Sequence, residues 1–112
     1  MKNKQTFVSF GDKKIEKAFN ELKEGKFQDK KLYEWVQRAK KDLKENPFCG
    51  IQIPKKLIPK KYVQKYDANN LWKYDLPSAW RLIYTIKGNE IMIISIVLEW
   101  MKHKDYEKRF RY

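Results

Sequence analysis

Three strand-like segments joined by short turns occupy the last third of this chain, and they constrain its fold more than any other feature. The segments are Leu71–Leu76, Trp80–Ile86 and Ile91–Val97, and they are separated by turns at Pro77–Ala79 and Lys87–Asn89. Short connections containing Pro, Gly or Asn between apolar runs are typical of β-hairpins. The pattern therefore predicts three consecutive antiparallel strands.

The first half of the chain predicts one strand followed by two helices. Thr6–Phe10 has strand-like composition and ends at Gly11. Asp12 suits the N-cap of a first helix, which Gly25 would end. A second helix is expected from about Gln28 to Glu45, because five apolar residues fall on one helical face: Leu32, Trp35, Val36, Ala39 and Leu43.

The segment between the helices and the last strands is rich in Lys and contains two prolines. Pro54 and Pro59 argue against a long central strand, so an extended loop is expected, with one short helical turn at Lys60–Lys65. The resulting order is β-α-α-β-β-β. It predicts an α+β fold, in which a small, mostly antiparallel sheet packs against an N-terminal two-helix hairpin. With 112 residues, the chain is expected to form a single domain spanning 1–112.

The net charge of the chain is +12, from 26 Lys and Arg against 14 Asp and Glu. Such a balance points to a polyanionic partner, either nucleic acid or an acidic protein, although a lysine-rich genome would also raise the net charge.

One cysteine and one histidine cannot supply the usual four ligands of a zinc site, so no metal is expected. Met1–Gln5 lacks the apolar stretch of a signal peptide, and Ile91–Leu98 is too short to span a bilayer. We therefore expect a cytoplasmic protein with no membrane partner.

Arg81 and Lys73 are the candidate functional cations of the predicted sheet. Strand alternation separates Arg81 from Trp80 and Leu82, and a guanidinium in an apolar strand must be solvated, paired or facing a ligand. The sequence leaves open a functional role or an ion pair with Asp75 or Glu90. Lys73 could lie beside Arg81 on the partner strand, or it could be an ordinary solvated lysine at the sheet edge.

The C-terminal segment adds the single histidine, His103, and a tyrosine three residues later, Tyr106. Histidine is the side chain that ordinarily titrates near neutral pH, and Tyr106 offers a ring and a hydroxyl. Basic segments interleaved with aromatic residues suit single-stranded RNA, although a frayed, charged terminus would look the same. The cations expected to contact nucleic acid are Lys55, Lys56, Lys60, Lys61, Lys65, Lys104, Lys108 and Arg109.

These segments together resemble the RelE/ParE superfamily of toxins from type II toxin–antitoxin modules. The resemblance is strongest in Leu71–Tyr74, in Trp80–Tyr84 and in His103–Tyr106, and it covers element order over nearly the whole chain. It implies a toxin that is neutralised by an acidic antitoxin. In the RelE-like branch, it implies an endoribonuclease that cuts mRNA on the ribosome without a metal or other cofactor.

The resemblance also implies roles for individual residues. Arg81 matches the family's strand arginine, which stabilises the charged phosphorane, and Lys73 matches a basic residue on the preceding strand. His103 and Tyr106 match tail positions that act as acid, base or stacking group. Asp75 departs from the pattern, because several members carry a second lysine near that position. The alternative is a non-nucleolytic protein on the same fold, either a gyrase-inhibiting ParE-like toxin or a catalytically lapsed RNA-binding relative; a plain basic nucleic-acid-binding domain would explain only the charge.

Overall fold

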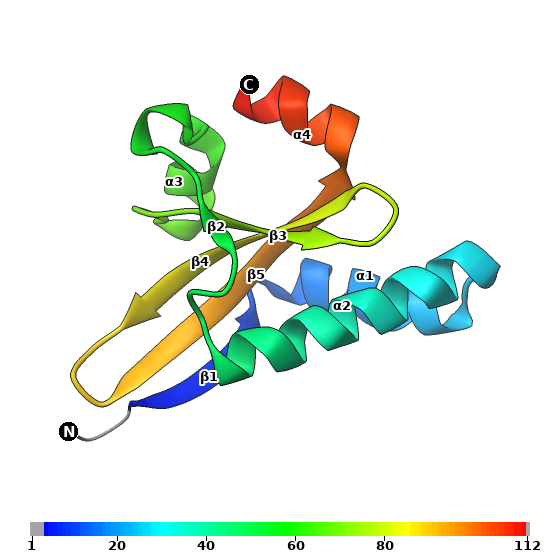
Figure 1. Ribbon diagram of the computed structural model, residues 1–112, viewed down its shortest axis with the longest axis horizontal. Helices are drawn as coiled ribbons and strands as arrows, with labels where there is room; N and C mark the ends of the chain where they lie inside the picture. Colours follow the sequence, from blue (N-terminus) through cyan, green and yellow to red (C-terminus); the bar gives the residue numbers. More distant parts are fainter. Residues whose placement is uncertain (1–3, 112) are drawn as a thin grey trace.

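A five-stranded mixed sheet with helices on both faces organises the computed structural model, which describes residues 4–111 (Figure 1). The polar segment Met1–Gln5 is therefore described only from Lys4 onward. No helix in the described part of the chain is long and apolar enough to cross a membrane. The elements are β1 (Gln5–Phe10), α1 (Lys13–Glu21), η1 (Leu22–Glu24), α2 (Phe27–Glu45), β2 (Ile51–Gln52), η2 (Lys55–Leu57), α3 (Lys60–Tyr66), β3 (Trp72–Leu76), β4 (Trp80–Gly88), β5 (Met92–Lys102) and α4 (His103–Phe110).

The strands follow the spatial order β1-β5-β4-β3-β2. β1 pairs with β5 in parallel, whereas β2, β3, β4 and β5 pair antiparallel to one another. The first and last strands in the sequence are therefore neighbours, and β1 forms one edge of the sheet. The α+β class expected from the sequence is confirmed. The count and order of the helices differ from the expectation, because α3 and α4 add to the early helical pair.

The early helices pack on one face of the sheet and form the first core. Asp12 caps α1, since its Oδ1 accepts a 2.9 Å hydrogen bond from the Ile15 backbone N–H, as the sequence predicts. Four residues of the predicted apolar stripe in α2 are buried, and Trp35 is half-buried beside them. The sheet side of this core consists of Leu76, Leu82, Tyr84 and Val97.

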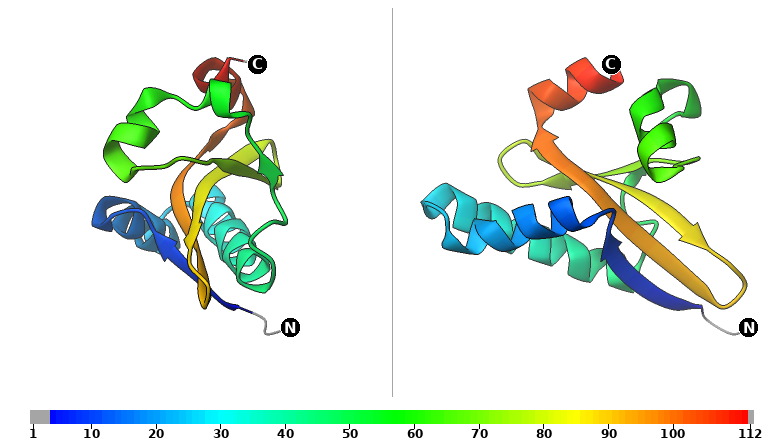
Figure 2. Two further views of the ribbon diagram at one scale, coloured as in Figure 1. Left: turned by 90° about the vertical axis from the view of Figure 1, so that its left-hand side faces the viewer. Right: turned by 180° about the vertical axis from the view of Figure 1, so that it is seen from behind.

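The later helices α3 and α4 cover the opposite face and form a second core (Figure 2). Tyr62 of α3 and Phe110 of α4 stack with 5.9 Å between their ring centroids, and both are fully buried. The strands contribute Ile83, Leu98 and Met101 to this core, and Leu71, just before β3, joins them. The strand alternation predicted for β4 is therefore confirmed: Leu82 and Tyr84 face α2, and Ile83 faces α3 and α4.

Two segments are more ordered than the sequence indicates. The region expected as a loop with a helical turn contains the two-residue strand β2 and the seven-residue helix α3. The segment expected as a basic tail forms helix α4. This helix packs against the sheet through Tyr106 and Phe110, which are one helical turn apart and both buried. β5 also continues past Val97 to Lys102, across a bulge where Ile83 pairs with Glu99 and Tyr84 with Val97.

The turn between β3 and β4 fixes the start of α4. Its central residues Ser78 and Ala79 have positive φ angles of 57° and 62°, as a type I′ hairpin turn requires, and Trp80 N–H reaches Pro77 O at 3.4 Å. Ala79 O accepts a 2.7 Å hydrogen bond from the His103 backbone N–H. The turn therefore holds the first residue of α4 beside the start of β4, the part of the strand that carries Arg81.

Candidate functional site

Arg81 lies directly opposite Asp75 in the β3–β4 pairing, on the face of the sheet that α3 and α4 cover. Its Nε lies 3.0 Å from Asp75 Oδ1, in an ion pair that lacks the angle of a hydrogen bond, and Nη1 donates to Trp80 O at 3.0 Å. Only 16% of the Arg81 side chain is exposed. Of the ion pairs that the sequence left open, the one with Asp75 forms.

Lys73 reaches the same carboxylate oxygen from two residues earlier in β3. Its Nζ donates to Asp75 Oδ1 at 2.9 Å, and 18% of the side chain is exposed. One exposed carboxylate therefore holds two cations of neighbouring strands and leaves this small region with an excess of one positive charge. The predicted proximity of Lys73 and Arg81 is observed, with Asp75 between them.

Helix α4 brings the two C-terminal candidates to this pair of cations. The Tyr106 ring lies 5.7 Å from Lys73 Nζ and 6.4 Å, centroid to centroid, from the His103 ring. His103 is half-exposed, and its Nε2 lies 3.2 Å from Glu107 Oε1. Its Nδ1 is buried without a hydrogen-bond partner among residues 4–111. The four candidate catalytic residues Arg81, Lys73, His103 and Tyr106 thus form one cluster, which we call the Asp75 cluster after its central carboxylate.

Tyr106 is the most enclosed member of the Asp75 cluster. Only 2% of its surface is exposed, and its ring packs 4.7 Å from that of Phe110. A nucleotide base needs a free ring face for stacking, and this ring has none in the structure. Tyr106 therefore does not offer a stacking surface to a base in this conformation.

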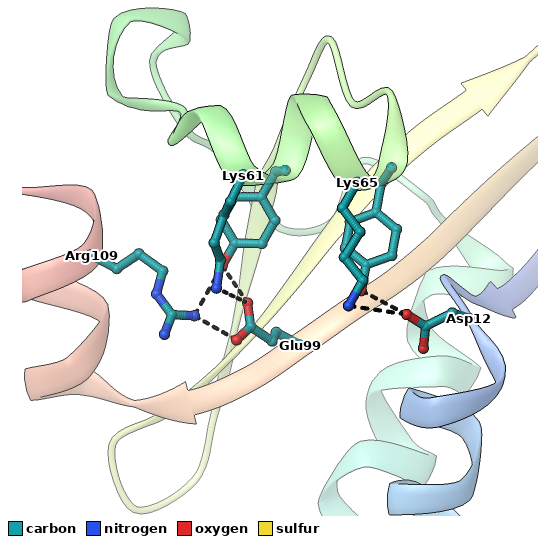
Figure 3. Close-up of polar contacts among 7 residues, drawn as sticks. Asp12, Lys61, Lys65, Glu99 and Arg109 are labelled. Carbon is teal, nitrogen blue, oxygen red and sulfur yellow. Dashed lines mark hydrogen bonds and ion pairs between the residues drawn. The ribbon is translucent and has the colours of Figure 1, made fainter.

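Three of the cations expected to bind nucleic acid are instead held by carboxylates of the fold (Figure 3). Lys65 Nζ lies 3.4 Å from Asp12 Oδ2, and Lys61 Nζ lies 3.7 Å from Glu99 Oε2. Arg109 Nη1 donates to Glu99 Oε1 at 2.5 Å. These ion pairs connect α3 to the start of α1, and α3 and α4 to β5, so part of the charge of the three cations is already neutralised.

Glu99 is the centre of this second polar network, which the sequence analysis did not identify. It also accepts a 2.5 Å hydrogen bond from the hydroxyl of Tyr62. Burial and the hydrogen bond to Glu99 raise the pKa of Tyr62 far above its ordinary value, so its hydroxyl remains a donor. A glutamate at the end of an apolar run, ten residues before an arginine, carries no recognisable signal of such a network.

The other expected nucleic-acid contacts are exposed and form no ion pair with any described residue. They lie on two neighbouring parts of the structure: the segment that leads into α3, and the outer side of α4. These residues are Lys55, Lys56, Lys60, Lys104 and Lys108. Their ammonium groups can meet phosphates without first breaking an internal contact.

Within residues 4–111, no group of three or more His, Cys, Asp or Glu side chains is arranged to hold a metal ion. Comparison with known proteins finds no family model, no curated protein and no solved structure that matches this chain.

Proposed function

We propose that this chain is the toxin of a type II toxin–antitoxin module, a metal-independent endoribonuclease of the RelE/ParE type that cleaves mRNA on the ribosome. The observation that carries the proposal is the Asp75 cluster, in which Arg81 and Lys73 lie on adjacent strands within reach of His103 and Tyr106. The elements β1, α1, α2, β3, β4 and β5 follow one another in the order expected from the resemblance, with β2, α3 and α4 added to it. Such a protein acts in the cytoplasm and is held inactive by an acidic antitoxin.

The reaction requires three contributions from the protein. A base takes the proton of the ribose 2′-OH, whose oxygen attacks the adjacent phosphorus, and an acid protonates the 5′-oxygen as its bond to phosphorus breaks. Fixed cations stabilise the negative charge of the phosphorane between these steps. Arg81 suits the last role through its permanent charge and planar fork, and Lys73 adds a second positive charge. His103 is the candidate for proton transfer, because it is half-exposed and its backbone is bonded to the turn between β3 and β4.

Asp75 occupies the position where the scissile phosphate would be bound. Its side chain is 48% exposed, so it can turn into solvent while a phosphodiester takes over its contacts with Arg81 and Lys73. This exchange replaces one singly charged anion by another and leaves both cations paired. The carboxylate therefore competes with substrate rather than blocking the site permanently.

A second candidate function is favoured by the same carboxylate and by the burial of Tyr106. A site whose cations are neutralised and whose aromatic ring is covered suits a protein that binds without cleaving. That protein would be either a gyrase-directed toxin or a catalytically lapsed RNA-binding relative. It would use the exposed lysines of the α3 segment and α4 for its partner.

The experiment that tests the proposal is cleavage of mRNA on programmed ribosomes in the presence of EDTA. The expected products are cut within the A-site codon and carry a 2′,3′-cyclic or 3′-phosphate and a 5′-hydroxyl, because the 2′-OH is the nucleophile. A supercoiling assay with DNA gyrase runs in parallel. Inhibition of gyrase without any mRNA cleavage would reject the ribonuclease and favour the second candidate.

A further inference from the structure

The open edge of β1 is the longest unprotected strand edge of the sheet. β1 pairs with β5 on one side only and spans six residues, whereas the strand at the opposite edge, β2, spans two. Native edge strands usually carry charged residues, proline or a bulge, which prevent another strand from pairing with them. β1 reads Gln-Thr-Phe-Val-Ser-Phe and has none of these features.

The backbone hydrogen bonds of β1 show which of its groups are directed outward. Gln5 N–H donates to Ile91 O at 3.1 Å, and Gly11 N–H, just past the strand, donates to Val97 O at 2.8 Å. Both donors are odd-numbered, and in a parallel pair alternate residues bond to the neighbouring strand. The N–H groups of the even-numbered residues, which are Thr6, Val8 and Phe10, therefore point away from β5 toward the open edge.

A basic groove runs beside this edge, between β1 and the C-terminal half of α2, which lie next to each other in Figure 1. Its volume is about 530 Å³, and no acidic residue lines it. The lining consists of Phe7, Val8, Gln37, Lys40, Lys41 and Lys44. None of these three lysines forms an ion pair with a described residue, although Lys40 Nζ lies 5.0 Å from the centroid of the Phe10 ring.

We propose that the β1 edge and this groove bind an extended, acidic segment of a partner protein, which adds to the sheet as a sixth strand. Added strands gain affinity from main-chain hydrogen bonds and specificity from alternate side chains. Here one set of side chains would meet Lys41 and Lys44, so carboxylates on that set are complementary. A second copy of this chain is a poor occupant, because it would bring the same lysines and a net charge of +12 to the contact.

Within the proposed function, the partner would be the antitoxin, and only that identification rests on the proposed function. In the sheet, β5 and β4 separate β1 from β3, which carries Lys73 and Asp75. Strand addition at β1 therefore does not require RNA cleavage. A variant that has lost strand addition can still be assayed for RNA cleavage, and a variant that has lost cleavage can still be assayed for strand addition.

A capped synthetic peptide in which glutamate and valine alternate is the probe, and amide hydrogen exchange followed by NMR is the measurement. The expected result is slower exchange at Thr6, Val8 and Phe10 when the peptide is added. Phe7 and Ser9 should change little, since the parallel ladder already protects their amides. Equal binding of a lysine–valine peptide, or protection confined to another element, would overturn the proposal.

Two kinds of variant measure separately how the charge of the groove and the strand edge contribute to peptide binding. Lys41→Gln with Lys44→Gln should weaken peptide binding about fivefold, because two partly exposed charge pairs are lost. The matched control, Lys13→Gln with Lys17→Gln on the exposed side of α1, should bind as the parent does. Val8→Pro removes an outward N–H without removing a bond to β5 and should abolish binding in a folded protein. Unchanged binding by Val8→Pro, or a dimer that protects the same amides without peptide, would contradict strand addition by an acidic partner.

Discussion

Arg81 and Asp75 face each other across β4 and β3, with 3.0 Å between the guanidinium Nε and the carboxylate Oδ1. The same oxygen accepts a hydrogen bond from Lys73, so the single carboxylate of Asp75 partly neutralises both cations of the candidate site. An anionic ligand that contacts both cations would compete with this carboxylate.

Asp75→Asn is expected to strengthen binding of a single-stranded RNA oligonucleotide about fivefold. The reason is the removal of a negative charge about 4 Å from the phosphate position, which is worth about 1 kcal/mol in water. Fluorescence anisotropy at fixed salt measures the change. Asp67→Asn is the matched control, because its side chain is 98% exposed and lies in the loop after α3. Weaker binding by Asp75→Asn than by the control would show that Asp75 does not compete with RNA.

Arg81→Ala is expected to slow mRNA cleavage on the ribosome by about 10²–10³-fold, as loss of one preorganised charge donor does in other enzymes. Arg81→Lys should also be slow, since lysine lacks the planar fork. His103→Ala should remove one limb of the pH–rate profile if this residue transfers a proton. Arg38→Ala on exposed α2 is the control and should cleave normally. A wild-type rate in Arg81→Ala would remove Arg81 from the reaction.

The exposed lysines near α3 are expected to contribute to nucleic-acid affinity through counterion release. Replacing Lys55, Lys56 and Lys60 by Gln should lower the slope of log affinity against log salt by about 0.7 for each lost phosphate contact on a single strand. A salt titration of RNA binding checks this. Replacing Lys61 and Lys65 instead should change the slope less, because both are already paired with carboxylates. Equal slopes in all variants would mean that neither set meets phosphate.

Glu99→Gln is expected to destabilise the fold by about 1–3 kcal/mol, because Arg109 loses its carboxylate partner in a partly buried network. The Tyr62 hydroxyl would also lose the carboxylate that accepts its hydrogen bond. Urea unfolding measures the difference in free energy of unfolding. Glu90→Gln serves as the control, since Glu90 is exposed and unpaired among the described residues. Similar unfolding midpoints for both variants would show that the network adds nothing to stability.

Asp12 gives stability a defined dependence on pH. The Ile15 backbone N–H, with smaller contributions from Tyr66 and Lys65, lowers the pKa of Asp12 below its ordinary value. A lowered folded-state pKa stabilises the fold above the unfolded pKa of about 3.9, and this contribution is lost as the pH falls through the folded pKa. Asp12→Ala should therefore cost about 1 kcal/mol at neutral pH and progressively less in acid.

Asp12→Asn separates the helix cap from the charge, because asparagine caps helices about as well as aspartate. It should keep most of the neutral-pH stability while losing the acid-dependent part. Urea unfolding between neutral pH and about pH 3 compares the three proteins. An Asp12→Ala penalty that stays constant over this range would contradict a role for the ionised carboxylate.

Periodicity predicted the elements that have one apolar side, and it was less informative for the rest. The stripe from Leu32 to Leu43 and the alternation from Arg81 to Tyr84 are confirmed, because burial on one face imposes a regular spacing. The helical turn expected at Lys60–Lys65 is helix α3, but the lysines of this segment hide its single buried residue, Tyr62, and so its packing against the sheet. The parallel pairing of β1 with β5 depends on how α1 and α2 cross the sheet, which no local pattern reports.

The sequence predicted which residues form the candidate site, but not the contacts that determine what those residues can do. Arg81, Lys73, His103 and Tyr106 do come together, because strand register and one turn of α4 bring them to the same end of the sheet. Their environments could not be read from the sequence. The enclosure of Tyr106 by Phe110 and the pairing of Arg109 with Glu99 both depend on where α4 packs.

The two cores lie back to back and share only the strands between them. Substitutions beneath α3 and α4 therefore repack one side of the sheet while the side chains beneath α1 and α2 keep their contacts. The face that carries the Asp75 cluster can thus change its chemistry over evolutionary time on a scaffold that the other face continues to stabilise. A chain built in this way can lose or gain an activity without a new fold.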